Sequence, residues 1–536
     1  MQHQHEQPPT KLRVAICGGG VGGLTLAYCL SRHPAANIAV DVYEAAARFT
    51  EVGAGIGMWW RTWALMCALG LERDIVALLE APPRDERVPT LHYRKADQPQ
   101  GVSFADLTAR GGLLTLHRAE FHHLLLARLA ACPHVRTHTS KRLRSYSSPS
   151  CSASSTQTQT QTQTYAHTQP GPITLTFADG STAQCDVLVG ADGVRSAVRA
   201  QLFSASSFAD ARIPADTAHI PISTAHTPTS ATQTPSAHAH TGTDSAYARP
   251  HWSGVLAYRA LVPAERLRAR APAHRVFGTP TQHLMAYPIS HGRYINLAAF
   301  THSGSACGAH SAHEAGDAGD AHDAGDADGP PEQWVADVDP GVVKGLFGGF
   351  EAEVGQLLDC LDGVKVSRWA VHVVKPLPTF AAGNVALLGD AAHAMTPFQG
   401  AGAGQAIEDA HLLSSLLTHP LTTRATAAHA LRVYSDVRRP LAHGVAARSA
   451  RNGALFAMRG GGDDGDGAGG DGGCGDGAGW GGGSGGEGEG EGGGEGACLE
   501  ELGRRIQAEF EGTWAGAAEA DVRRAVGMLE GALAGP

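Results

Sequence analysis

The stretch LRVAICGGGVGGLTLAYCL, residues 12–30, decides the fold. Its first six residues form an apolar run typical of a buried strand, and residues 24–30 have the apolar character of a buried helix. Between them lie Gly18, Gly20 and Gly23, spaced as G-x-G-x-x-G. Such glycines let the backbone turn tightly and approach a pyrophosphate at the helix N-terminus.

A second apolar run, residues 38–43, completes a βαβ unit, and Glu44 follows it directly. A carboxylate at the end of the second strand accepts hydrogen bonds from the ribose of a bound adenosine. The order of strand, glycine turn, helix, strand and acid therefore predicts a dinucleotide-binding α/β domain with a doubly wound sheet. It does not distinguish FAD from NAD.

Two later stretches extend this unit. CDVLVGADGVRSAVR, residues 185–199, follows a predicted strand pair at 173–177 and 183–185. GDAAHAMTPFQGAGAG, residues 389–404, follows an apolar run and precedes a predicted helix. Asp390 therefore stands at the carboxyl end of a buried strand, where open α/β sheets bind ligands.

Together with the glycine turn, these stretches resemble the class A FAD-dependent monooxygenases, which share the fold of para-hydroxybenzoate hydroxylase. The extension QGAGAGQAIEDA, residues 399–410, resembles their salicylate-hydroxylase-like branch. The resemblance covers nearly the whole chain outside four low-complexity inserts. It implies an α/β fold with a Rossmann-type FAD-binding domain, an inserted β-sheet substrate domain and a C-terminal helical segment.

The domains are expected at defined boundaries. Residues 11–80, 111–203 and 365–440 would form the FAD-binding domain, 81–110 and 249–364 the substrate domain, and 441–536 the C-terminal helices. Residues 1–10 and the inserts 146–170, 204–248, 303–333 and 459–497 have too few large apolar side chains to offset the ordering entropy, so we expect them to be disordered.

The resemblance implies an FAD contact for each matching residue. Gly18, Gly20 and Gly23 would contact the pyrophosphate, Glu44 the adenosine ribose, Arg118 the pyrophosphate or ribityl chain, and Asp390 the ribityl chain. Ala54, Gly55 and Gly57 would line the flavin ring, Ala403 its pyrimidine edge, and Asp192 and Gly193 the flavin and a transient nicotinamide. A helix that begins near Gly402 would direct its N–H groups at the flavin edge that becomes negative on reduction.

The implied reaction is hydroxylation of a small phenolic or salicylate-like aromatic substrate. NADH or NADPH reduces FAD, O₂ adds at the flavin C4a, and the hydroperoxide passes one oxygen atom to the ring. The same FAD motifs also serve epoxidases of isoprenoids or polyketides. A flavoprotein with only uncoupled NAD(P)H oxidase activity is a third hypothesis.

Three residues are candidates for contacts with the substrate and the reactive side of the flavin. Arg259 would pair bidentately with a carboxylate, or else form a structural ion pair on its strand. Tyr287 would hydrogen-bond the substrate, or else be a core tyrosine. Pro397 has no N–H, and its carbonyl would face the reactive side of the flavin.

Phe398 stands where some salicylate-type relatives have a histidine that is a plausible base for the phenol. Phenylalanine cannot move a proton, so His372 and His393 are the alternatives for this role, although a histidine in such a position is more often structural. Trp59 and Trp60 replace a Pro/Asn-like stretch of relatives, and we expect these indoles to reshape the entrance of the pocket.

Composition restricts the remaining functions. The net charge of −10 without a basic patch argues against nucleic-acid binding, and no apolar run reaches the roughly 18 residues that a membrane span needs. Ten cysteines without a Cys-x-x-Cys pair indicate a reduced, intracellular and cytoplasmic protein without disulfides. No metal site is expected, the protein would be a monomer or homodimer, and residues 499–533 would form a packed helical cap.

Overall fold

The computed structural model describes residues 10–49, 55–147, 171–204, 246–267, 275–279, 282–302, 331, 333–458 and 492–534. Ala54 and most of the segments expected to be disordered lie outside these ranges. Several ends differ from the expectation; among them, strand β8 (Leu143–Ser147) runs two residues into the first insert, and helix α12 (Gly492–Trp514) begins inside the last.

A six-stranded sheet carries the sequence unit from which the fold was predicted. Its strand order is β18 (Ala381–Ala382), β19 (Val385–Leu387), β11 (Val187–Gly190), β1 (Leu12–Cys17), β2 (Ile38–Tyr43) and β7 (Val135–His138). All neighbours are parallel except the β18–β19 edge pair. The order places the carboxyl ends of β1, β11 and β19 side by side, which is where ligands bind in such sheets.

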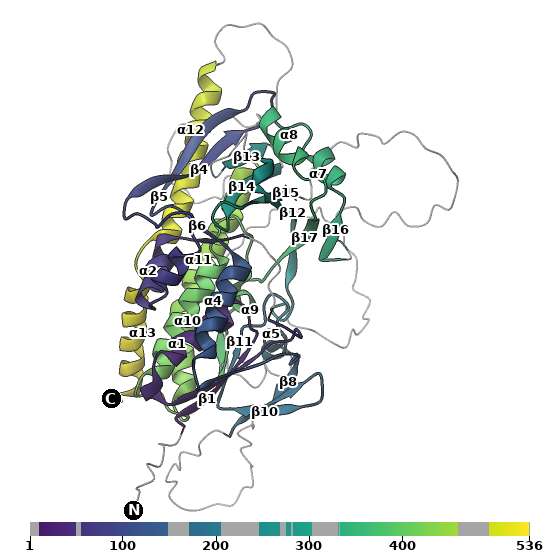
Figure 1. Cartoon of the computed structure of the whole chain (residues 1–536). Helices are drawn as coiled ribbons and strands as arrows, with labels where there is room; N and C mark the ends of the chain where they lie inside the picture. Colours follow the sequence, from purple (N-terminus) through teal and green to yellow (C-terminus); the bar gives the residue numbers. More distant parts are fainter. Residues whose placement is uncertain are drawn as a thin grey trace, which may run out of the picture.

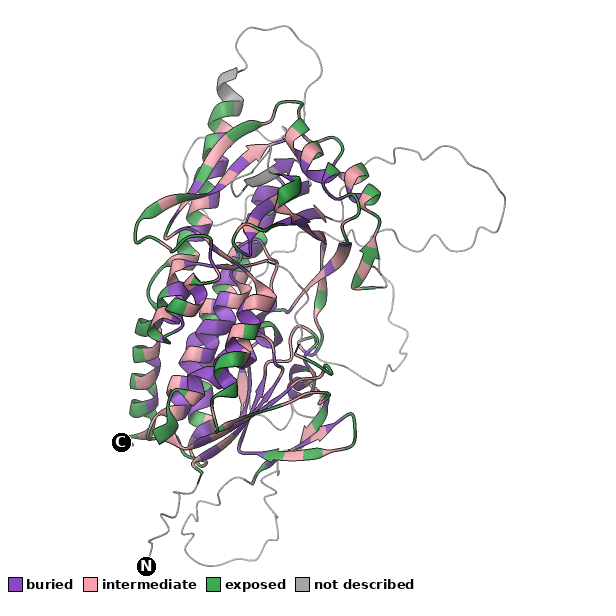
Figure 2. Ribbon diagram, viewed as in Figure 1, coloured by how far each residue is buried: buried purple, intermediate pink, exposed green. Residues whose placement is uncertain are grey.

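Helices pack around this sheet (Figure 1). They are α1 (Val21–Ser31), α4 (Arg118–Ala130), α10 (Gly402–Thr418) and the long α11 (Ala427–Phe456). Figure 2 shows that α1 and α10 are buried along most of their length, as their apolar sequences require. The N-termini of α1 and α10 therefore have fixed positions near the carboxyl ends of the parallel strands.

An eight-stranded sheet lies above the first in Figure 1. Its order is β16 (Val335–Val338), β17 (Val366–Val373), β12 (His251–Pro263), β15 (Tyr294–His302), β14 (Gln282–Ile289), β13 (Arg275–Thr279), β4 (Arg87–Lys95) and β5 (Val102–Arg110). Apolar residues of α7 (Pro340–Leu346) and α8 (Ala352–Asp359) join the core on one face of this sheet. Residues of the other face pack with Phe398, α12 and the end of α11.

The smaller elements connect these layers. Three strands, β10 (Thr182–Cys185), β9 (Ile173–Phe177) and β8, form one sheet, and β3 (Gly55–Met58) pairs with β6 (Leu114–His117). The short helices are α2 (Trp60–Ala68), α3 (Glu72–Val76), α5 (Ala197–Leu202), α9 (Asp390–His393) and the 3₁₀ turns Pro34–Ala36 and Ala264–Arg266. The α/β fold class is confirmed, whereas the domain boundaries stay a prediction.

The predicted C-terminal cap consists of two helices, α12 and α13 (Ala518–Leu533). Leu499, Leu502, Ile506 and Phe510 are buried on α12, as their helical spacing predicts. No helix in the described ranges is both long and apolar enough to span a bilayer. Seven cysteines fall in these ranges and are free thiols.

Candidate functional site: a two-part cleft between the sheets

The glycine turn brings α1 close to the sheet. Gly18 has a φ of +113°, and a Cβ there would lie 2.1 Å from the carbonyl oxygen of Ala191. A Cβ on Gly23 would lie 2.1 Å from the carbonyl oxygen of Gly18. Only glycine fits at both positions. Gly23 serves this close packing of helix and turn and lines neither of the two pockets described below.

An outer pocket of about 390 Å³ lies at this turn. Gly18 and Glu44 line it, and the Glu44 carboxylate accepts hydrogen bonds from the backbone N–H groups of Gly19 at 2.9 Å and Ala46 at 2.7 Å. Asp192 also lines it, and burial raises the pKa of its carboxyl group. Asp192 caps α5 by accepting the N–H groups of Ala197 and Val198, a structural role that the sequence did not predict.

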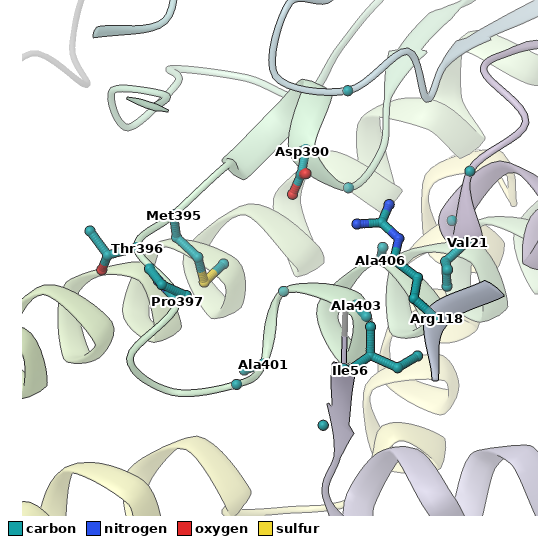
Figure 3. A pocket seen from close by; sticks show the side chains of 18 of the residues that line it. Val21, Ile56, Arg118, Asp390, Met395, Thr396, Pro397, Ala401, Ala403 and Ala406 are labelled. Carbon is teal, nitrogen blue, oxygen red and sulfur yellow. The ribbon is translucent and has the colours of Figure 1, made fainter. Parts of the chain in front are cut away.

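An inner cavity of about 330 Å³ continues from the outer pocket, because Gly20, Ala191 and Gly193 line both. Of the residues expected to contact FAD or substrate, the following line the inner cavity: Gly20, Gly55, Gly57, Arg118, Gly193, Arg259, Tyr287, Asp390, Pro397, Gly402 and Ala403. Residues from opposite ends of the sequence thus meet in one cleft (Figure 3).

The walls of the inner cavity suit a flat, anionic dinucleotide. Around the ideal Cβ positions of Gly193 and Gly402 there is open space, so a ligand can approach the backbone closely. Arg118 and the exposed Asp390 point into the same space in Figure 3, and Gly402 begins α10. The cleft therefore offers a cation for the pyrophosphate, a carboxylate that can accept hydrogen bonds from ribityl hydroxyls, and a helix N-terminus for the flavin edge. These residues fit FAD.

Strands β12, β14 and β15 form the roof of the inner cavity. Their register pairs Arg259 with Ala298, Met285 with Ala298, and Tyr287 with Asn296, so alternation points this set to one face. Within the described ranges, the Arg259 guanidinium has no ion pair and its Nε has no hydrogen-bond partner. Burial, reinforced by the nearby charge of Arg118, lowers the pKa of Arg259.

This environment removes one of the two interpretations of Arg259, namely a structural ion pair. The side chain instead lies near the Trp369 ring, with Cζ 5.6 Å from the ring centroid. Burial raises the pKa of the neighbouring Tyr287 to about 12, so its hydroxyl is neutral near pH 7. The roof therefore presents one cation without an anion and one neutral hydroxyl to the cavity.

His372 is not brought to the cavity. Its ring stacks on Trp334 with centroids 3.5 Å apart, and its Nδ1 lies 2.9 Å from the carbonyl oxygen of Ala370. Along β17, Trp369 shares the face of Arg259, and the side chain three residues later points to the opposite face. Position on the strand, which the sequence alone did not define, directs His372 away from the lining of the inner cavity.

Phe398 and the two tryptophans also lie away from the cavity. Phe398 is buried between Phe300 and His283, with ring centroids 5.2 and 5.0 Å away. Trp59 donates its indole N–H to the carbonyl oxygen of Gln399 at 2.8 Å, behind the loop that carries Pro397. Neither tryptophan lines either part of the cleft, but Trp59 lines a further small pocket that shares Gly57, Gly400 and Ala401 with the inner cavity, so a reshaped entrance stays a prediction.

Sequence reasoning missed several lining residues: Met285, Asn296, Ala298, Phe300, Met395 and Thr396. Asn296 accepts the Gly55 N–H at 3.1 Å and so ties the roof to the strand β3 below. A polar residue inside the apolar run YINLAAF, residues 294–300, was an available signal for Asn296. The others are apolar or small, and their sequence pattern is that of core residues.

The fold and the two-part cleft define a flavoprotein of the α/β class, with a substrate chamber roofed by a second sheet. The chain matches the model of the FAD binding domain family over residues 11–272 and 362–449, and it belongs to that family. Within it, the chain is a class A FAD-dependent monooxygenase of the salicylate-hydroxylase-like branch, as its motifs predicted.

Two curated relatives and one solved structure give the extent of the similarity. The FAD-dependent monooxygenase str9 of Strobilurus tenacellus is 34% identical, over 84% of this chain and 89% of its own length. A salicylate hydroxylase of Pseudomonas putida is 28% identical, over 84% of this chain and 86% of its own length. A salicylate hydroxylase substrate complex matches the fold with a TM-score of 0.64, 24% identity, and coverage of 97% of this chain and 98% of its own.

Proposed function

We propose that this monooxygenase uses NAD(P)H and O₂ to hydroxylate a small anionic aromatic molecule, such as a phenolic acid. The observation that carries the proposal is the Arg259 guanidinium, which faces the cavity without an anionic partner in the described structure. A buried charge without a partner is costly, and a substrate carboxylate or phenolate would satisfy it in bidentate geometry.

The other lining residues fit the same substrate class. Met285, Phe300 and Pro397 provide apolar surface for a planar ring. The neutral Tyr287 hydroxyl can donate a hydrogen bond to a carboxylate or a carbonyl oxygen. The salicylate hydroxylase of Pseudomonas putida, a relative by sequence, is named for an aromatic acid of this kind.

Bound FAD, reduced by NAD(P)H, supplies the activation of O₂. Gly20, Arg118, Asp390 and the N-terminus of α10 would hold the flavin, and the roof would shield its ring from water. No histidine is among the described residues that line the inner cavity. We therefore propose that Arg259 favours the phenolate electrostatically, in place of a histidine base.

The alternatives differ in what they require of the roof. An epoxidase of an isoprenoid or polyketide would leave the Arg259 guanidinium facing an uncharged chain. An enzyme that only oxidises NAD(P)H would need no anion site. Arg259 therefore favours the aromatic hydroxylase over both.

The decisive experiment is a screen of phenolic and aromatic acids with the purified FAD-loaded protein. We expect one class of acid to accelerate oxidation of NADH or NADPH and to yield a product that carries one atom from ¹⁸O₂. The uncharged methyl ester of the best acid is the matched control and should stimulate poorly. Stimulation without labelled product, or equal rates with acid and ester, would contradict the proposal.

A further inference from the structure

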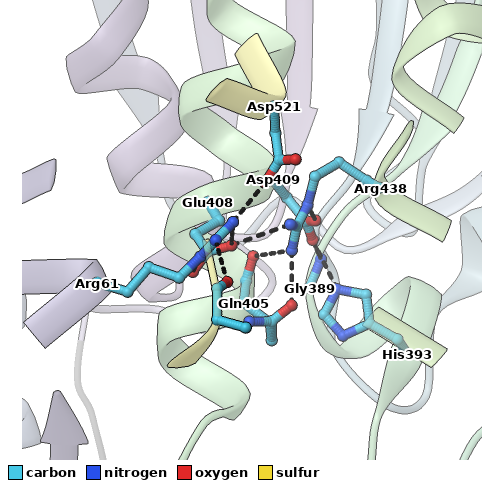
Figure 4. A network of polar contacts seen from close by, with 9 residues as sticks. Arg61, Gly389, His393, Gln405, Glu408, Asp409, Arg438 and Asp521 are labelled. Atoms are coloured by element: carbon cyan, nitrogen blue, oxygen red, sulfur yellow. Dashed lines mark hydrogen bonds and ion pairs between the residues drawn. The ribbon is translucent and has the colours of Figure 1, made fainter. Parts of the chain in front are cut away.

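An ion-pair chain runs from Asp521 on helix α13 to Asp409 on α10, beside Gly389 (Figure 4). It consists of Asp521, Arg61, Glu408, Arg438 and Asp409. Arg61 Nη2 lies 2.5 Å from Asp521 Oδ2, while its Nε and Nη2 lie 2.9 and 3.1 Å from the two oxygens of Glu408. One guanidinium from α2 thus connects α13 with α10.

Arg438 of α11 continues the chain. Its Nη1 donates to Glu408 Oε2 at 3.0 Å and its Nε to Asp409 Oδ1 at 2.7 Å. The second oxygen of Asp409 accepts the backbone N–H of Gly389 at 3.0 Å and lies 2.6 Å from His393 Nε2. The ion-pair chain therefore ends at the Gly389 turn, which positions Asp390.

The two segments that Asp409 connects, the Gly389 turn and α10, both contribute to the cavity wall. Gly389 and Asp390 line the inner cavity, and so does the first turn of α10, which precedes Glu408 and Asp409 by about one helical turn. Gly389 has a φ of +62°, and a Cβ there would lie 3.1 Å from that of Ala406. A shift of α10 would thus move the cradle of the flavin and the Asp390 turn together.

Burial makes the ion-pair chain resist displacement of its side chains. Arg438 is 1% exposed, Asp409 0% and Glu408 4%. Burial alone raises the pKa of Asp409, but His393 and Arg438 outweigh it and lower that pKa to about 2. Separating such charges leaves them desolvated and unpaired, so small displacements are opposed strongly. The family match ends at residue 449, whereas Asp521 lies beyond it in α13.

We propose that Arg61 and Asp521 are positioning residues for FAD, through which α13 holds the N-terminus of α10 and the Asp390 turn in their binding geometry. This inference rests on FAD binding, not on the identity of the substrate. The test is therefore a titration of FAD-free protein with FAD, followed by flavin fluorescence, and it needs neither NAD(P)H nor an aromatic acid.

The variant Asp521→Asn keeps the shape and removes the charge. We expect its Kd for FAD to rise roughly fivefold. The rise in melting temperature on FAD addition should shrink accordingly. Asp521→Glu restores the carboxylate and should return the Kd to within about twofold of the parent. Arg524→Gln is the control, because Arg524 is an exposed residue of the same helix and has no ion pair within the described ranges, whereas Glu519 would not serve because it pairs with His411 of α10.

Circular dichroism of the FAD-free variants reports whether each one folds. If Asp521→Asn lowers the melting temperatures of FAD-free and FAD-loaded protein equally and leaves the Kd unchanged, the pair only fastens α13 to the fold. That result, or an equal rise in Kd for Arg524→Gln, would overturn the proposal. If the parent protein binds FAD but hydroxylates no aromatic acid, the proposed reaction is contradicted and this inference still stands.

Discussion

Two buried arginines on opposite sides of the FAD cleft have contrasting surroundings. Behind the cleft, Arg438 contacts Glu408, Asp409 and Gln405. Burial lowers the pKa of Arg438, but the two carboxylates outweigh it and raise that pKa above its usual value. In the roof, Arg259 meets no anion among the described residues, and burial lowers its pKa.

The contrast separates a charge that serves the fold from a charge that serves a ligand. Removing Arg438 would take the only arginine from the buried Asp409 within the described ranges and would leave Glu408 paired with Arg61 alone. Removing Arg259 would leave no protein group unpaired, because its counterion is expected to arrive with the substrate. Replacing Arg438 should therefore lower the stability of the fold, whereas replacing Arg259 should lower catalysis and leave stability intact.

The largest effect is expected behind the cleft. Arg438→Met should destabilise the protein by about 3–5 kcal/mol, because Glu408 and Asp409 remain charged and desolvated. Urea unfolding followed by circular dichroism measures this loss. Arg432→Met, an exposed arginine of the same helix, is the control and should change little. Similar losses for both variants would remove the distinction between the two arginines.

In the roof, Arg259→Gln should lower kcat/KM for the aromatic acid by about 100-fold, since one charge-assisted contact to the substrate is lost. The unfolding free energy should stay the same or rise, because a buried charge without a partner has been removed. Steady-state kinetics with the acid and its methyl ester provides the measurement. An equal loss with both substrates would show that Arg259 does not recognise the anion.

His443 on α11 tests the cost of burying an unpaired charge, because its charge can be changed by pH. Burial, then the charges of Arg439 and His393, lower the pKa of His443 to about 4 from a usual value of 6.5. Its stabilising neutral form is fully present above pH 6.5, and the stability is lost as pH falls toward 4, because the unfolded chain binds the proton more readily. At pH 5 the loss is about 2 kcal/mol.

The measurement is urea unfolding at pH 7.5 and pH 5. His443→Leu should flatten the difference between the two pH values, whereas His429→Leu, at an exposed position of α11, should keep it. If both variants retain the full acid sensitivity, the imidazole of His443 is not the group that titrates.

The sequence predicted the parts of the cleft that depend on local structure. The glycine turn, the strand before it and Asp390 at the end of a buried strand lie where the pattern placed them, because turn chemistry and strand ends are encoded within a few residues. The start of α10 at Gly402 was predicted for the same reason.

Features that depend on distant pairing were missed. His372 lies on the outward face of β17, and only its register with β12 defines that face. Asp521 meets Arg61, 460 positions away in the chain, and nothing near either residue indicates the other. Composition could not separate the lining residues Met285 and Phe300 from core residues, because both environments favour apolar side chains.

The smallest expected effect concerns Tyr287, which shares the roof with Arg259 but is neutral at working pH because burial raises its pKa to about 12. Tyr287→Phe removes one uncharged hydrogen-bond donor, so kcat/KM for the aromatic acid should fall about fivefold, far less than for Arg259→Gln. The effect should appear in KM for the acid and should leave FAD affinity unchanged. Steady-state kinetics and an FAD titration of the same preparation measure both. A loss as large as that of Arg259→Gln would mean that the hydroxyl, not the guanidinium, provides the main contact to the anion, and the contrast between paired and unpaired arginines would no longer explain substrate binding.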